Sequence, residues 1–230
     1  EVFRRDAENG VTSEWLLSYH TLEPVLVPHL RQTDRLLIIG CGNTDFSAKL
    51  YDAGFRSQVN NDISALVIEH MRQQNAEREG MEWQVQDALD MDYQNEEFDV
   101  VLDKSLLDCM HYLDTDMDAS IEDMLCEAFR VVKVGGVCLF VTIRDPEETA
   151  AFFDEEEGMG LAWDVSVYEY VAECDESYSV AKSAVLHKPE DLRRDGRIFP
   201  HSQQFFLYVC RRLQEPTTQE KSIDQAVLQH

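Results

Sequence analysis

A glycine turn followed by a strand-end acid is the part of this chain best suited to binding a small organic cofactor. Residues 36–43 read Leu-Leu-Ile-Ile-Gly-Cys-Gly-Asn, and a second apolar run ends at Asp62. Glycines let a turn approach its ligand closely, and a carboxylate at the next strand end can accept hydrogen bonds from both ribose hydroxyls. Two glycines without a third favour a mononucleoside cofactor over a dinucleotide. The alternative for Asp62 is a capping role beside Ser64.

Two further strand ends carry polar groups. Asp87 and Ala88 follow one apolar run, and Asp103 and Lys104 end the next. Carboxyl ends of parallel strands meet at one edge of a sheet, so we expect Asp87 and Ala88 to contact an adenine and Asp103 to lie near the reacting group. Asp108 is one turn further on and is expected to face the same cleft. The alternatives are a turn acid at Asp87 and a structural ion pair between Asp103 and Lys104.

Apolar runs that alternate with helical patterns predict an α/β fold with a doubly wound, mostly parallel sheet. The expected strands are residues 35–39, 57–61, 82–86, 98–102, 137–143, 163–171 and 203–211. The expected helices are residues 13–30, 44–52, 64–79 and 120–132. Pro24 and Pro28 are expected to break or kink the helix over 13–30. Asn43 or Thr44 is expected to cap the helix over 44–52, and Ser64 the helix over 64–79. We expect a helical lid over residues 1–34, one domain over 35–213 and a polar tail over 214–230.

Composition limits the function classes. The chain has 230 residues and a net charge of −25, which argues against nucleic-acid binding and favours a cationic partner, although a merely solubilising acidic surface is the alternative. No apolar run approaches the ~20 residues that span a bilayer. The six cysteines form no Cys-x-x-Cys pair, so we expect free thiols, no metal site and a cytoplasmic location.

Beyond the glycine turn, the blocks Leu-Tyr-Asp-Ala-Gly-Phe, Asn-Asp-Ile-Ser and Phe-Asp-Val-Val-Leu-Asp-Lys-Ser-Leu-Leu-Asp carry a resemblance to a known family. The chain resembles class I S-adenosylmethionine-dependent methyltransferases, in particular the group with lysine methyltransferases of elongation factor 1-alpha and citrate synthase. That group commonly has Asp-Lys-Gly-Thr-Leu-Asp in the last block, where this chain has Ser105 and Leu106 in place of Gly-Thr. Many class I enzymes have an acid where this chain has Ile38, so the methionine ammonium needs another partner.

The resemblance implies a seven-stranded Rossmann-like fold that binds S-adenosylmethionine and releases S-adenosylhomocysteine. It implies that Asp103, Lys104 and Asp108 act at the methyl-transfer centre. The implied cofactor-binding residues are Trp15, Tyr19, Gly40, Cys41, Gly42, Asn43, Asp62, Ile63, Asp87, Ala88 and Asp103. For Trp15 and Tyr19, four residues apart on the expected first helix, core packing is the alternative to a lid role. Cys41 has no base nearby in the sequence, so we interpret it as a packing residue rather than a nucleophile.

The resemblance and the acidity together predict methyl transfer to a lysine of a basic protein, with an elongation factor as the first candidate. Small-molecule methylation, with a closed apolar pocket under residues 172–202, and a cofactor-binding scaffold without turnover are the alternatives. We hypothesise an acidic rim that recruits the substrate, formed by Asp145, Glu147, Glu148, Glu173, Asp175 and Glu176. A basic cluster can pair with this rim or contact an acidic partner, and consists of Lys182, Lys188, Arg193, Arg194 and Arg197. The sequence does not indicate an oligomeric state.

Overall fold

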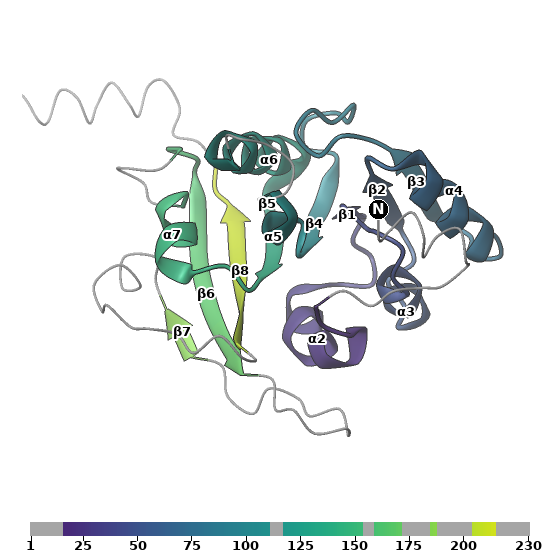
Figure 1. Cartoon of the computed structure of the whole chain (residues 1–230), viewed down its shortest axis with the longest axis horizontal. Coiled ribbons are helices and arrows are strands. Elements are labelled where there is room, and N and C mark those ends of the chain that lie inside the picture. The colour runs from purple at the N-terminus through teal and green to yellow at the C-terminus, as the bar shows by residue number, and fades with distance from the viewer. Residues whose placement is uncertain (1–15, 111–116, 154–158, 172–184, 188–203, 215–230) are drawn as a thin grey trace, which may run out of the picture.

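A mixed β-sheet with helices on both faces forms the framework of the protein (Figure 1). The computed structural model describes residues 16–110, 117–153, 159–171, 185–187 and 204–214. Its strands are β1 (Leu36–Ile39), β2 (Gln58–Asp62), β3 (Met81–Val85), β4 (Phe98–Lys104), β5 (Val132–Thr142), β6 (Trp163–Val171), β7 (Val185–His187) and β8 (Gln204–Arg212). Their order across the sheet is β3-β2-β1-β4-β5-β8-β6-β7. The first five are parallel, whereas β8 runs antiparallel between β5 and β6.

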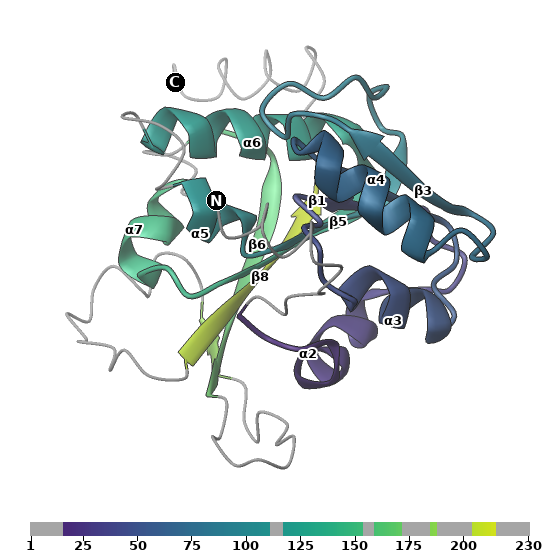
Figure 2. The same ribbon diagram turned by 45° about the vertical axis from the view of Figure 1, so that its right-hand side comes forward.

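The helices divide between the two faces of the sheet (Figure 2). They are α2 (Tyr19–Leu26), the 3-10 helix η1 (Val27–His29), α3 (Phe46–Asp52), α4 (Ala65–Gln74), α5 (Leu106–Cys109), α6 (Met117–Val131) and α7 (Pro146–Ala151). Buried residues of α2, α3 and α4 pack on one face, and those of α5, α6 and α7 pack on the other. None of the helices in these ranges is long and apolar enough to cross a membrane.

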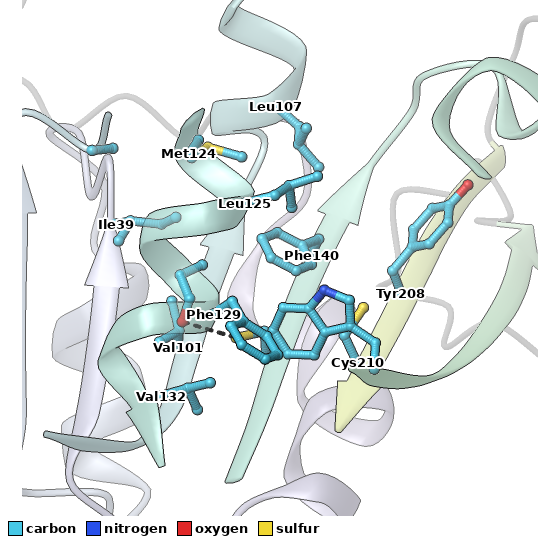
Figure 3. Packing of buried hydrophobic residues seen from close by; sticks show 14 of the residues in the cluster. Ile39, Val101, Leu107, Met124, Leu125, Phe129, Val132, Phe140, Tyr208 and Cys210 are labelled. Atoms are coloured by element: carbon cyan, nitrogen blue, oxygen red, sulfur yellow. Dashed lines mark hydrogen bonds between the residues drawn. The ribbon is translucent and has the colours of Figure 1, made fainter. Parts of the chain in front are cut away.

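The period-two alternation of the strands supplies both hydrophobic cores. Leu36 and Ile38 of β1 belong to the core under α2 and α3, whereas Leu37 and Ile39 belong to the core under α6. In the second core Ile39, Val101 and Phe140 lie beside Met124 and Leu125 of α6 (Figure 3). Aromatic packing extends this core to β6, because the ring of Phe129 meets that of Trp163 edge to face at 4.8 Å.

The expected α/β fold and its seven strands are confirmed, and the structure corrects two details. The short strand β7 is additional, and it lies in the connection between the last two expected strands. Strand β5 begins at Val132, directly after α6, and not at Val137. Gly135 and Gly136 fall between the expected helix 120–132 and the expected strand 137–143, but they lie within β5 at an irregularity in its pairing with β4. Pairing with β4 thus extends β5 back through both glycines to the end of α6.

The structure also corrects the first helix. Helix α2 begins after Ser18, whose hydroxyl accepts a hydrogen bond from Thr21 N. Pro24 lies inside this helix. Residues 16–18 are not helical. Trp15, the expected partner of Tyr19, lies outside the described residues.

Two other helix ends differ from expectation. Helix α4 ends at Gln74 instead of the expected residue 79, and Asn75 Nδ2 donates to the carbonyl of Met71 at 2.8 Å at this end. The residue before α3 is Asp45, while the Thr44 hydroxyl accepts from Phe46 N at 3.3 Å. The cap at Ser64 is confirmed, because its hydroxyl accepts from Val67 N.

Candidate functional site

The turn after β1 is tied to the end of β2. Gly40 and Gly42 have φ of +57° and +59°, in the left-handed region that favours glycine. Gly40 N donates to Asn61 Oδ1 at 3.2 Å, and Cys41 N donates to the Asn61 carbonyl at 2.8 Å. The side chain of Asn43 is fully buried. The turn is thus held as a rigid loop over the carboxyl end of β2.

Asp62 joins this turn to the start of α4. Its Oδ2 accepts from Gly42 N at 3.0 Å, and its Oδ1 accepts from Ser64 N at 2.9 Å. Burial raises the pKa of Asp62, and these two hydrogen bonds oppose the shift without cancelling it. A carboxylate offers about four lone pairs, so each oxygen of Asp62 can still accept one hydroxyl. The spacing of this acid from the turn therefore suits a ribose diol.

Two exposed apolar side chains, those of Ile63 and Val85, lie next to Asp62. Ile63 is 63% exposed, and Val85, which pairs with Asp62 in the β2–β3 register, is 52% exposed. Large apolar residues so exposed beside a half-buried carboxylate suit the face of a flat aromatic ring. Sequence reasoning included Ile63 and missed Val85, which the strand register would have placed beside Asp62.

Asp87 and Ala88 lie at the start of the loop after β3. Asp87 is exposed and accepts from Leu89 N at 3.0 Å, whereas Ala88 is buried. Asp87 also forms an isolated bridge with Asp90, which makes a tight turn at this point.

Two residues of α6 bind the loop after β3, which carries Asp87 and Ala88. Glu127 accepts from Met91 N at 2.6 Å, and Arg130 donates to the carbonyls of Met91 and Tyr93 at 2.7 and 2.6 Å. Arg130 Nε also pairs with Glu127 at 2.6 Å. Sequence reasoning missed this clamp, because it joins positions far apart in the chain.

Asp103 is fully buried at the end of β4. Its two oxygens accept from Leu106 N at 2.6 Å and from Leu107 N at 3.1 Å, so it caps the short helix α5. Burial, assisted by the charge of Asp108, raises the pKa of Asp103 to about 7, although the two backbone hydrogen bonds lower it. At neutral pH this carboxyl is therefore partly protonated.

Lys104 extends toward a different part of the molecule. Its Nζ lies 3.5 Å from the carbonyl of Leu17 and 5.6 Å from the centroid of the Phe46 ring. Consecutive strand residues point to opposite faces of a sheet, which explains why Asp103 and Lys104 diverge. Lys104 thus contacts the segment before α2 and the start of α3.

Ser105 adopts a glycine-like conformation. Its φ is +69°, at the position where the resembling enzymes commonly have glycine. Ser105 is buried, and its hydroxyl has no hydrogen-bond partner among the described residues. A non-glycine residue in the left-handed region lowers the free energy of unfolding by about 1–2 kcal/mol, so Ser105 adopts this conformation at a cost in stability.

Asp108 is held by the end of β5. Its Oδ1 accepts from the Thr142 hydroxyl at 2.6 Å and from Ile143 N at 3.2 Å. Its Oδ2 is buried and has no hydrogen-bond partner in the described part of the chain. Thr142 was not singled out in the sequence, because its contact with Asp108 depends on β4 and β5 lying side by side.

Two thiols near the site are kept neutral. Burial raises the pKa of Cys109 to about 11, and the charges of Asp103, Asp108 and Asp62 add to the shift. Burial also raises the pKa of Cys41 well above its ordinary value. Both observations argue against a thiolate nucleophile and agree with the interpretation of Cys41 as a packing residue. The described residues contain no group of three or more His, Cys, Asp or Glu side chains that could hold a metal ion.

Tyr19 is the described member of the expected lid pair, and it belongs to the core. It is buried, its ring lies 5.9 Å from that of Phe46, and its hydroxyl donates to Glu23 at 3.2 Å. Burial, with the nearby Glu23, raises its pKa. This placement favours the packing alternative for Tyr19.

Part of the expected acidic rim follows β5. Asp145 caps α7 because its Oδ1 accepts a hydrogen bond from Glu147 N at 2.8 Å. Glu148 Oε2 lies 3.9 Å from Arg144 Nη2. Because α7 comes directly after the carboxyl end of β5, these acids lie on the same edge of the sheet as Asp62 and Asp103. Outside the described residues lie Glu173, Asp175 and Glu176 and the basic residues Lys182, Lys188, Arg193, Arg194 and Arg197.

The chain is similar to known methyltransferases in sequence. A curated protein of Danio rerio named eEF1A lysine and N-terminal methyltransferase is 38% identical over 148 residues, which cover 61% of this chain and 20% of that protein. EEF1A lysine methyltransferase 4 of Mus musculus is 28% identical over 149 residues, which cover 62% of this chain and 58% of that protein. The chain thus spans about a fifth of the length of the first of these relatives.

Solved structures share the fold. A SAM-dependent methyltransferase from Methanosarcina mazei superposes with a TM-score of 0.52 at 19% identity, covering 84% of this chain and 98% of that one. Phosphoethanolamine N-methyltransferase 1 of Haemonchus contortus, solved with phosphoethanolamine and S-adenosylhomocysteine, gives 0.60 at 15% identity and covers 94% of this chain and 49% of that one.

These similarities confirm the resemblance to S-adenosylmethionine-dependent methyltransferases at the level of family and fold. The family model, described as Methyltransferase domain, matches residues 31–186 and thereby more than half of the sequence. The chain with its turn at Gly40, its acid at Asp62 and its mixed sheet therefore belongs to the methyltransferase domain family.

Proposed function

We propose that this chain transfers a methyl group from S-adenosylmethionine to the side-chain amine of a protein lysine, with elongation factor 1-alpha as the first candidate. The observation that carries the cofactor assignment is the position of Asp62, hydrogen-bonded between Gly42 N and Ser64 N beside the glycine turn. The acceptor assignment is supported by the relatives named for eEF1A lysine methylation.

The residues at this edge fit the cofactor chemically. The Gly40–Asn43 turn would contact the methionine part, Asp62 the ribose, and Asp87 with Ala88 the adenine. Ile63 and Val85 offer the exposed apolar surface that an adenine ring would cover. When bound, S-adenosylmethionine supplies a methyl group activated by a sulfonium. The side chain of Ile38 has no charge, so Asp103 is the candidate for holding the methionine ammonium.

The acceptor amine must lose its proton before it can attack. Carboxylates near a lysine favour the charged ammonium, which is unreactive. Asp103, with a pKa of about 7, is partly neutral and so weakens this effect. In this proposal Asp103 positions α5, while Asp108, fixed by Thr142, orients the amine through its remaining oxygen. Orientation of the two reactants then supplies most of the rate acceleration.

The charge of the chain supports a basic protein as the acceptor. Asp145, Glu147 and Glu148 lie at the site edge, and the net charge of −25 extends the attraction over longer distances. Cys41, Cys109, Cys126, Cys138 and Cys210 are free thiols, which supports a reducing compartment such as the cytosol.

A second amine acceptor follows from the same chemistry. The curated relatives are also named for N-terminal methylation, and an α-amine loses its proton more readily than a lysine amine. Acetylation of the acceptor's N-terminus separates the two, since only lysine methylation survives it. Small-molecule methylation and a scaffold role are the remaining alternatives.

The test is transfer of radiolabel from S-adenosylmethionine to purified elongation factor 1-alpha and to cell extract. We expect a labelled protein band with the wild type, and loss of both label and S-adenosylhomocysteine binding in Asp62→Asn. Asp118→Asn, on the exposed surface of α6, removes the same charge and should change neither. Calorimetric binding of S-adenosylhomocysteine without transfer to any protein would support the scaffold or small-molecule alternative, and absence of binding would contradict the cofactor assignment.

A further inference from the structure

A cavity lies on the opposite side of the sheet from the glycine turn, where the parallel strands begin. Its volume is about 330 Å³, and its lining comes from η1 and the loop after it, the start of β4, the first part of β5 and the end of β8. These segments meet at the amino ends of the parallel strands, whereas Asp62 and Asp103 lie at the carboxyl ends. Its charged and titratable lining residues are His29, Arg31, Asp34, Asp99, Lys133 and Arg211. The cavity is therefore separate from the methyltransferase site.

An irregularity in β5 builds one wall of this cavity. Phe98 pairs with Val132 and Val100 with Val137, so Asp99 alone faces the bulge formed by residues 133–136. A Cβ at Gly136 would lie 2.7 Å from the Asp99 carbonyl oxygen, so glycine lets the bulge lie close against β4. Bulges re-aim side chains and are frequent beside functional sites.

The two acids of the cavity already have partners. Asp99 Oδ1 pairs with Lys133 Nζ at 2.8 Å, and its Oδ2 accepts from Arg35 N at 2.9 Å. Burial raises the pKa of Asp99, but these hydrogen bonds outweigh that effect and leave the pKa lowered. Asp34 accepts from the backbone N–H of Arg31 at 2.7 Å. Both carboxylates are thus occupied.

The two arginines of the cavity are in the opposite situation. Within the described part of the chain, neither the Arg31 nor the Arg211 guanidinium forms a hydrogen bond or an ion pair. Burial and the charge of Arg211 together lower the pKa of His29, so this imidazole is neutral beside a cation. In a chain with net charge −25, a cavity lined by three cationic and two acidic side chains, with both arginines unpaired among the described residues, is an exception to the general charge distribution.

We propose that this cavity binds a phosphate group, held by the Arg31 and Arg211 guanidinium groups with Lys133 adding charge. Guanidinium forks bind phosphate oxygens in pairs, and several converging cations match a multiply charged oxyanion better than a single carboxylate. The volume lies at the lower end of the range for small-ligand sites, so there is room for a phosphate and a small substituent. The phosphate comes either from a free phosphorylated compound or from a phosphorylated side chain of a protein.

The experiment is calorimetric titration of the whole chain with inorganic pyrophosphate and with a phosphoserine peptide, at constant ionic strength. Arg31→Gln and Arg211→Gln each remove one fork, and Arg56→Gln is the matched control, because it removes one positive charge from an exposed site away from the cavity. We expect the first two variants to weaken pyrophosphate binding by about tenfold or more, and the control to leave it unchanged. Binding of either probe that depends on Arg31 and Arg211 supports the proposal. The probe that binds more tightly than the other identifies the source of the phosphate.

Two results would overturn the proposal. One is absence of binding of both probes to the wild type at ~10 mM, a concentration at which even a weak specific site is occupied. The other is equal weakening in all three variants, which would indicate a general charge effect. Affinity for S-adenosylhomocysteine should be the same in every variant, so a failure at this cavity is distinct from a failure of the proposed methyl transfer.

Discussion

The side chain of Leu106 occupies the space beside the bare Cα of Gly40. A Cβ at Gly40 would lie 2.8 Å from Leu106 Cδ1 and 3.1 Å from Leu106 Cβ. The turn after β1 and the start of α5 after β4 are therefore in van der Waals contact. Because Asp103 caps α5 and Asp62 holds the turn, the two halves of the candidate site are packed into one unit.

Gly40→Ala should disturb this contact more than Gly42→Ala. Both positions have positive φ, so each alanine adds about 1–2 kcal/mol of backbone strain, but only the Gly40 substitution also clashes with Leu106, adding ~1–3 kcal/mol. At Gly42 the nearest atom is Thr44 Cγ2 at 4.0 Å. Urea unfolding of both variants measures the difference. Equal losses of stability would show that Leu106 moves aside without cost.

Ser105→Gly should stabilise the protein by about 1 kcal/mol, because glycine adopts φ of +69° without the strain that serine bears. Ser105→Ala is the control that removes the unpartnered hydroxyl and keeps the strain. Thermal and urea unfolding of the three proteins separate the two contributions. A Gly variant less stable than the wild type would mean that the hydroxyl has a stabilising role.

Stability should depend on pH through Asp103. Its pKa is about 7 in the folded protein and 3.8 as an ordinary value, so the folded state binds more protons between these limits. The contribution of Asp103 to stability is therefore fully present below pH ~4 and is lost as the pH rises through 7. The difference in free energy of unfolding between the wild type and Asp103→Asn should become less favourable to the wild type across this range. A difference independent of pH would contradict the raised pKa.

Arg130→Ala should weaken S-adenosylhomocysteine binding by about tenfold, because the loop that carries Asp87 and Ala88 loses its clamp on α6. Arg72→Ala is a close control: Arg72 also extends from a helix, pairs with Glu69 three residues earlier and donates to a backbone carbonyl, that of Trp83 at 2.7 Å. It should lower stability and leave the affinity unchanged. Calorimetry and thermal unfolding of both variants test this, and equal affinities would reduce the clamp to a purely structural role.

Charge reversal at Glu147 and Glu148 should raise the KM for a basic protein substrate several-fold and flatten its dependence on salt, because exposed charges steer encounter. Glu148 is exposed and Glu147 partly so, whereas Asp145 is left intact because it caps α7. Reversal of Glu77 and Glu79, on the loop after α4, gives the same change in net charge as a control. The kcat should not change. Identical KM values for both double variants would show that Glu147 and Glu148 do not recruit the substrate.

The candidate cofactor site was predictable because its signals are local. A buried run, a glycine turn and an acid at the next strand end need no knowledge of distant contacts, and the structure brings Gly42 and Asp62 together through a hydrogen bond. Contacts such as those of Thr142 with Asp108 and of Arg130 with Tyr93 join residues from different elements. They form only when the sheet and α6 pack together, so no local pattern indicates them.

The fold was predictable where hydrophobic periodicity is strong, and less so at element ends. Gly135 and Gly136 suggested a break between helix and strand, but pairing of β5 with β4 outweighs the local preference of two glycines. At Ser105 the backbone demanded by the turn before α5 prevails over the residue's own preference. Helical spacing predicts one helix from residue 13 onward, yet the cap at Ser18 starts α2 at Tyr19.

The place of β8 in the sheet has a consequence for how the protein is made. Strands β6 and β7 precede β8 in the chain but join the parallel strands only through it. Arg212, at the end of β8, also donates to the carbonyls of Phe129 and Val132 at 2.9 and 2.7 Å, where α6 ends. During synthesis on the ribosome, β6 and β7 therefore cannot join the parallel strands before β8 has emerged, and a chain truncated before β8 would leave both without a place in the sheet.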